Sequence, residues 1–284
     1  MSVTPESLFR EWFLPLYPED AKSDLGRARS MDANPANNLT VLAHLDDAAA
    51  VYKAYDESGK AVMHLQAAVT GFDRFVRCIG FGPQTHYVLY DPTAPLHDRY
   101  TTQTNFISDA EKEHLRKETL TINAFFGWEF NSCESLRKDG VWHPIDFANP
   151  CPDSQVTSLH FHFPWMVKAY IRWSVFCAAT KRKMRKNQDW SPFYEVAALD
   201  IPYSEKLDRY AAIADERFET KKFEAFCAKN LAQLDQVAWD FFGTEEAKDA
   251  VRQKVSALFP PHEVEKFTEL FWSRIQDWRK AEKP

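Results

Sequence analysis

The chain has 284 residues, of which 45% are hydrophobic and 14% aromatic. This composition supports one large packed domain, or one domain with an appendix, and excludes a wholly disordered chain. The formal net charge of −6 gives no general attraction to nucleic acid or to anionic lipid, so we expect neither as a partner. No run of about 18 uninterrupted apolar residues predicts a membrane span, and the first residues do not resemble a signal peptide. Five scattered cysteines indicate reduced thiols and a cytoplasmic location.

The N-terminal part reads as loosely organised over residues 1–39, because apolar residues are sparse there. A strand is then predicted at 39–42, followed by a helix at 46–59 that Gly59 closes, and a strand at 60–69. Two β-rich runs follow at 74–81 and 85–90, separated by Gly82 and Pro83. This arrangement predicts a β-hairpin.

A helix is predicted over residues 108–126, with Ser108 as its N-cap and Glu111 completing a capping box. Strand-like runs at 128–136 and 141–147 flank the turn residues 138–140, which predicts a second hairpin. Two hairpins with a helix between them imply a mixed, largely antiparallel sheet with flanking helices. We therefore expect an α+β domain over residues 40–200.

Helical spacing of apolar residues dominates the rest of the chain. Residues 164–186 predict a helix that ends in a basic run, which is favourable at a helix C-terminus. Residues 223–241 and 264–278 repeat apolar positions at i, i+3 and i+4 and predict amphipathic helices. We expect a helical C-terminal extension over 201–284. Its apolar stripes either complete the core or form a surface for a second copy or a partner chain.

Oxygen ligands are concentrated between residues 123 and 153. Glu134 and Asp146 fall on adjacent predicted strands, Asn149 follows, and Glu129 lies shortly before. Side chains that face each other across a strand pair lie within about 5 Å, and Mg²⁺ takes one or two carboxylates together with phosphate and water oxygens. The pattern therefore predicts a metal site between the strands; the alternative is a pair of solvated strand residues near a turn.

Several ordered blocks resemble the C-terminal half of an ATP-grasp domain, over about residues 40 to 175. They read MHLQAAVTGFDRFVRCIGFG, YVLYDP, INAFFGWEFNSCE and GVWHPIDFANPCPD. The family consists mainly of carboxylate–amine and carboxylate–thiol ligases. The resemblance implies ATP and Mg²⁺ as cofactors and a small carboxylate as substrate.

Site residues follow from the resemblance position by position. Adenine would bond to the backbone of a hinge strand, Asp73 would lie near the ribose, and Arg77 would approach the phosphates as the catalytic cation. Glu134 and Asp146 would hold the metal with Asn149, although two residues separate this acid from the asparagine where most members have one. The hinge strand would comprise Gln66, Ala67, Ala68 and Val69.

The implied chemistry is transfer of the γ-phosphoryl group of ATP to a carboxylate, followed by attack of an amine on the acyl phosphate. The protein would position the reactants and neutralise phosphate charge. The family also uses two lysines upstream of the hinge strand and a glycine-containing loop. Here Lys22, Lys53 and Lys60 are the lysines before Gln66, and residues 31–42 contain no glycine. A degenerate, non-catalytic module that serves as a binding scaffold is therefore the main alternative.

A zinc-dependent hydrolase is a third reading. His160 and His162 are predicted on one face of a strand-like run, and Cys133 and Cys151 are further candidate ligands. No CxxC or HExxH motif accompanies them. The alternative is an aromatic-rich segment with partly buried histidines.

Overall fold

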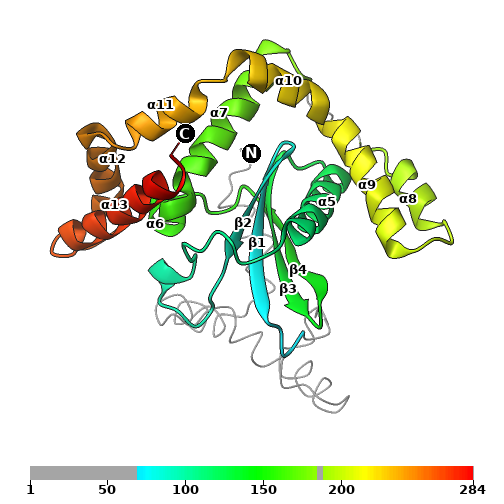
Figure 1. Cartoon of the computed structure of the whole chain (residues 1–284), viewed down its shortest axis with the longest axis horizontal. Helices are drawn as coiled ribbons and strands as arrows, with labels where there is room; N and C mark the ends of the chain where they lie inside the picture. Colours follow the sequence, from blue (N-terminus) through cyan, green and yellow to red (C-terminus); the bar gives the residue numbers. More distant parts are fainter. Residues whose placement is uncertain (1–68, 184–187, 284) are drawn as a thin grey trace, which may run out of the picture. The chain divides into compact units, whose positions relative to one another are not determined.

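The computed structural model describes residues 69–183 and 188–283 (Figure 1). The chain divides into two compact units, 1–70 and 71–284, and every element below belongs to the second. The predicted elements at 39–42 and 46–59 lie outside the described residues, as does the strand at 60–69 apart from Val69, which is not in a strand. The strands are β1 (Arg74–Phe81), β2 (Gln84–Leu89), β3 (Phe130–Lys138) and β4 (Val141–Pro150). The helices are η3 (Leu96–Asp98), α5 (Asp109–Phe126), α6 (Val156–Leu159), η4 (His160–His162), α7 (Phe163–Ala179), α8 (Ser191–Ala197), α9 (Tyr203–Phe218), α10 (Thr220–Asn230), α11 (Leu234–Phe241), α12 (Glu245–Ser256) and α13 (Val264–Ala281).

The four strands form one sheet in the order β2-β1-β3-β4. Both predicted hairpins are confirmed: Phe81 pairs with Gln84 across the first turn, and Lys138 pairs with Val141 across the second. The second turn uses Asp139 and Gly140, both at positive φ, as a two-residue hairpin requires. The α+β class is confirmed, and every pairing among these strands is antiparallel, so the described part shows no parallel component of the expected mixed sheet.

Helix α5 begins and ends at the predicted residues because both ends carry local signals. The Ser108 hydroxyl accepts the Glu111 N–H, and the Glu111 carboxylate accepts the Ser108 N–H, which completes the capping box. Gly127 ends the helix in the left-handed conformation at φ 74°.

Helix α5 covers one face of the sheet. Val76 and Cys78 of β1 and Cys133 of β3 are buried there with Leu115 of the helix. Gly80 lets the Asn123 side chain of α5 approach β1 closely, since a Cβ at position 80 would lie 2.4 Å from Asn123 Nδ2. A residue without a side chain at position 80 therefore lets Asn123 reach the sheet.

Helix α7 packs against the sheet at the β1–β2 turn, where Ile79 and Phe81 share one core with Trp173 and Phe176. Leu120 and Ala124 of α5 also belong to this core. Buried residues of α8, α9 and α10 belong to the same core, namely Phe193, Ala214, Phe218 and Phe223. The first part of the expected C-terminal extension thus packs together with the sheet. A second core joins α12 and α13 to Phe161 through Val255, Phe271 and Ile275.

Some helix boundaries differ from the prediction. The run at His160–His162 is a 3-10 helix between α6 and α7 and not a strand, because Pro164 near the start of α7 favours helix initiation. Helix α7 ends at Ala179, and the stretch at 223–241 divides into α10 and α11. None of the described helices is long and apolar enough to cross a membrane. All five cysteines are free.

Replacement of Gly80 by alanine should lower the free energy of unfolding by about 1–3 kcal/mol, because the new Cβ collides with the Asn123 side chain. Urea denaturation measures this loss. In an Asn123→Ala background the same substitution should cost clearly less, because the colliding amide is gone. An equal cost in both backgrounds would show that Gly80 is not required for this approach.

Candidate functional site

Three of the predicted site residues lie in one row across the sheet. Arg77 of β1 faces Glu134 of β3, and Glu134 faces Asp146 of β4. Residues that face each other in an antiparallel pair project from the same side of the sheet. The structure therefore brings the expected cation and the two expected carboxylates together on one face, opposite the face that α5 covers.

Irregular pairing of β4 accounts for the extra residue between Asp146 and Asn149. Ser132 faces Asn149 and Glu134 faces Asp146, so a two-residue step on β3 matches a three-residue step on β4. The additional β4 residue is a β-bulge, and the register shifts again before Pro144. In a regular strand Asp146 and Asn149 would project from opposite faces. The bulge instead pairs both of them with residues on one face.

The side chain of Asn149 is oriented by Ser132. Its Nδ2 donates to Ser132 Oγ at 3.2 Å, and Ser132 is fully buried. This hydrogen bond uses the amide nitrogen and leaves the amide oxygen, the atom that binds cations. Asn149 is thus arranged as an oxygen ligand on the face that carries Glu134.

Arg77 is a buried cation, with an exposed fraction of 2%. Its guanidinium donates to the Tyr100 hydroxyl and, at 3.2 Å, to the backbone oxygen of Asp153, and it lies 5.0 Å from the centre of the Tyr100 ring. Burial raises the pKa of Tyr100 to about 12, so its hydroxyl stays neutral. The Arg77 Nε–H is buried without a hydrogen-bond partner in the described part of the chain.

The charge of Glu134 is disfavoured by its surroundings. Burial and the nearby Asp146 carboxylate raise the pKa of Glu134, and Arg77 opposes this shift. No hydrogen bond to the described residues contributes to that shift. A bound cation would relieve both the desolvation of the half-buried Glu134 and its repulsion from the exposed Asp146, so this pair is suited to hold one.

Other predicted site residues are engaged elsewhere or not described. Asp73 accepts a hydrogen bond from Arg137 Nε at 3.0 Å, and bonding to this arginine lowers the pKa of Asp73. Glu129 accepts from Arg182 at 3.0 Å. Val69 is half-buried in an irregular segment of the first unit. Gln66, Ala67 and Ala68 of the expected adenine edge lie outside the described residues.

Of the two histidines in the zinc interpretation, His162 has hydrogen bonds at both ring nitrogens, whereas the Nε2 of His160 is buried without a hydrogen-bond partner among the described residues. His162 Nδ1 lies 2.8 Å from His86 Nε2, and His162 Nε2 lies 2.7 Å from the Thr101 oxygen. His160 Nδ1 accepts the Phe161 N–H at 2.8 Å. In the described ranges no group of three or more His, Cys, Asp or Glu side chains is placed to hold a metal ion. Glu134 and Asp146 are two carboxylates with an amide, a set that suits Mg²⁺ bound through phosphate oxygens and water.

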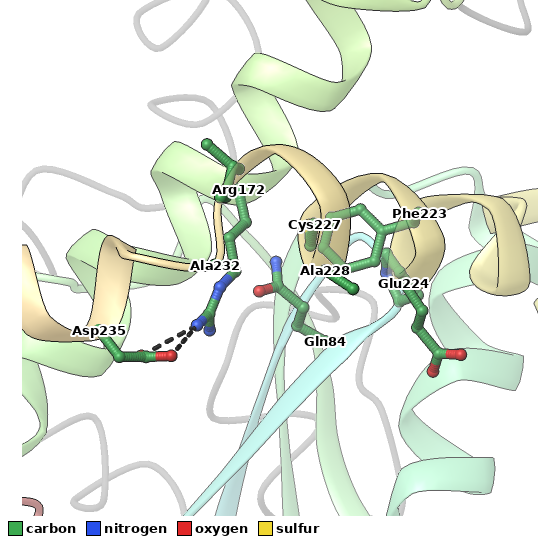
Figure 2. A pocket seen from close by; sticks show the side chains of 10 residues that line it. Gln84, Arg172, Phe223, Glu224, Cys227, Ala228, Ala232 and Asp235 are labelled. Carbon is green, nitrogen blue, oxygen red and sulfur yellow. Dashed lines mark hydrogen bonds and ion pairs between the residues drawn. The ribbon is translucent and has the colours of Figure 1, made fainter. Parts of the chain in front are cut away.

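A cavity of about 410 Å³ lies away from this row, between the β1–β2 turn and helices α7, α10 and α11 (Figure 2). Its Arg172 donates to both oxygens of Asp235, at 2.9 and 2.8 Å, and the Gln84 Nε2 donates to two backbone carbonyls. Because these polar groups bind one another, we regard them as structural contacts between α7, α11 and the hairpin.

Sequence reasoning missed several groups around the row. Tyr100 reaches Arg77 because the segment after β2 folds back, with Tyr90 bridged to Tyr100; no local pattern marks this contact. Asn131 and Ser132 lie three and two residues before the predicted Glu134, in a strand with many polar residues, so their polarity did not mark them. Both are fully buried.

Acid should destabilise the protein through the buried histidines. Burial lowers the pKa of His160 and of His162 to about 4, whereas an unfolded histidine titrates near pH 6.5. Burial of the two neutral histidines therefore costs no free energy of unfolding above about pH 6.5. As the pH falls from 6.5 toward 4, the free energy of unfolding decreases by at most about 1.4 kcal/mol per pH unit for each histidine. Urea denaturation at pH 7, 6 and 5 should show that the free energy of unfolding decreases less in His162→Gln than in the wild type. His262→Gln, at an exposed position, should leave the loss unchanged; equal slopes in all three proteins would contradict the assignment.

Replacement of Glu134 by glutamine should leave the unliganded protein at least as stable as the wild type at pH 7. The raised pKa means that ionisation of Glu134 destabilises the fold. Any gain in the stability of the variant over the wild type should therefore be largest at neutral pH. It should vanish near pH 4, where the wild-type carboxyl is protonated. Thermal unfolding over this pH range measures the effect, with the exposed Glu195→Gln as control. A loss of more than about 1 kcal/mol would show that Glu134 has a structural role.

No model of a known protein family matches the chain, nor does any curated protein or solved structure.

Proposed function

We propose that residues 71–284 carry the metal-binding side of a Mg²⁺-dependent ATP site of the ATP-grasp type, and that the protein is a carboxylate–amine ligase. The observation that carries the proposal is the cross-strand row of Arg77, Glu134 and Asp146, which Asn149 joins through the β4 bulge. The ordered sequence blocks of the ATP-grasp resemblance contain these same residues.

Each residue has a chemical task in this proposal. Glu134 and Asp146 supply carboxylate oxygens for Mg²⁺, and Asn149 supplies an amide oxygen. Arg77 provides a fixed positive charge beside them, and its Nε–H is a donor for an anionic oxygen. Bound Mg²⁺ would neutralise the charge of the phosphate oxygens, which is the main requirement for phosphoryl transfer to a carboxylate. The chain's own contribution is to hold these groups in place before ATP binds.

The non-catalytic alternative differs from the ligase in one respect. It binds a nucleotide without transferring its phosphoryl group. This module is the second candidate because residues 31–42 contain neither the lysines nor the glycine-containing loop that the resemblance implies. Release of ADP in mixtures of small carboxylates and amines distinguishes the two. A ligase requires both an acid and an amine for release, whereas a scaffold gives none.

Mg·ATP should stabilise the wild-type protein against thermal unfolding, and Asp146→Asn should abolish the effect. A ligand at 100 times its dissociation constant adds about 2.7 kcal/mol, which raises the midpoint by about 2–4 °C per kcal/mol. ATP with EDTA should give little shift, because the phosphates then lack the metal. Asp200→Asn, at an exposed position without an element of secondary structure, should respond like the wild type. An unchanged unfolding midpoint of the wild-type protein at millimolar Mg·ATP would contradict the proposed site.

A further inference from the structure

The β4 bulge is held by a single buried side chain on the other face of the sheet. Asn131 Oδ1 accepts the Asn149 N–H at 3.0 Å, and Asn131 Nδ2 donates to the Phe147 oxygen at 2.9 Å. One amide therefore binds the backbone on both sides of Ala148. Asn131 has no exposed surface.

A second asparagine orients the first. Asn131 Nδ2 also donates to Asn123 Oδ1 of α5 at 2.8 Å, and Asn123 is fully buried. The backbone oxygen of Asn123 accepts the N–H groups of Gly127 and Trp128 at the end of the helix. The end of α5 is thereby connected to the bulge through two amide side chains.

The cross-strand neighbours of Asn131 leave room for this arrangement. Asn131 faces Gly80 on one side and Pro150 on the other. Gly80 has no side chain to exclude Asn123, and Pro150 has no N–H to donate to β3. The Asn131 amide uses both its nitrogen and its oxygen in hydrogen bonds, and a buried side chain bonded in this way favours one backbone arrangement. The Asn123 Nδ2 is buried without a hydrogen-bond partner among the described residues.

We propose that Asn131, oriented by Asn123, is a positioning residue that fixes the β4 bulge and thereby sets Asp146 and Asn149 for Mg·ATP. This inference rests on the proposed function. Asn131 contacts neither metal nor nucleotide, since it lies on the α5 face of the sheet. It determines the backbone positions of Phe147 and Asn149, and through them which β4 side chains face Glu134 and Ser132. Removal of groups that orient metal ligands reduces metal affinity by about 10- to 100-fold.

The test compares three variants of the full chain. Asn131→Leu has a similar size and loses all three hydrogen bonds, whereas Asn131→Asp keeps an acceptor for the Asn149 N–H and loses the donor. Leu115→Ala is the matched control, because Leu115 of α5 is fully buried on the same face of the sheet, in the core that includes Cys78 and Cys133, and belongs to neither β3 nor β4. Two quantities are measured: amide hydrogen exchange at Asn149 in the free protein, and the affinity for ATP with Mn²⁺ at a temperature where all variants are folded.

Asn131→Leu should increase exchange at Asn149 and weaken Mn·ATP binding by about 10- to 100-fold, with Asn131→Asp between it and the wild type. Leu115→Ala should bind within about twofold of the wild type even though it is less stable, which separates positioning from general destabilisation. Unchanged Mn·ATP affinity in Asn131→Leu would overturn the inference and leave the proposed site intact. A wild-type protein that does not bind Mn·ATP would overturn the proposed function, and the positioning role with it. Should Asn131→Leu fail to fold, Asn131→Asp and Asn123→Ala provide the same comparison.

Discussion

The register of β4 against β3 is the constraint on which the arrangement of the site depends. If the pairing of Ser132 with Asn149 continued without interruption, Phe147 would face Glu134; if that of Ser135 with Pro144 continued, Ile145 would do so. The two shifts in register place Asp146 there instead. A β-bulge thus replaces an apolar side chain by a carboxylate opposite Glu134, which is a recurrent use of bulges near functional sites.

This arrangement brings together charged groups whose burial and repulsion destabilise the protein while no ligand is bound. Burial and the nearby Asp146 disfavour the ionised form of Glu134. The Arg77 guanidinium is buried, and its Nε–H has no hydrogen-bond partner among the described residues. The two cores, under α5 and under α7, hold the strands from both faces and keep the row in place. Repulsion and incomplete pairing of this kind are typical of sites that gain stability when a ligand binds.

Local signals predicted much of this fold, and long-range contacts determined the remainder. Turn residues and a capping box identified both hairpins and α5, and alternation along the strands put Glu134 and Asp146 on neighbouring strands. The bulge was not predictable, because it depends on Asn131 and Asn123, which meet through tertiary packing. The helical run at His160–His162 was missed since a short aromatic segment fits strand and helix equally well. The burial of α9 and α10 in the core of the sheet also depends on packing and not on their own sequence pattern.

Paramagnetic broadening by Mn²⁺ in the presence of ATP tests the central claim most directly, because it locates the metal on the molecule. The account predicts that the backbone amide signals of Glu134, Asp146 and Asn149 broaden first, at metal concentrations that leave α12 and α13 unaffected. Backbone signals of α5, such as that of Leu115, should broaden later, since the sheet lies between this helix and the ion. Broadening that begins in α12 or α13, or that spreads evenly over the chain, would contradict a metal site on this face of the sheet.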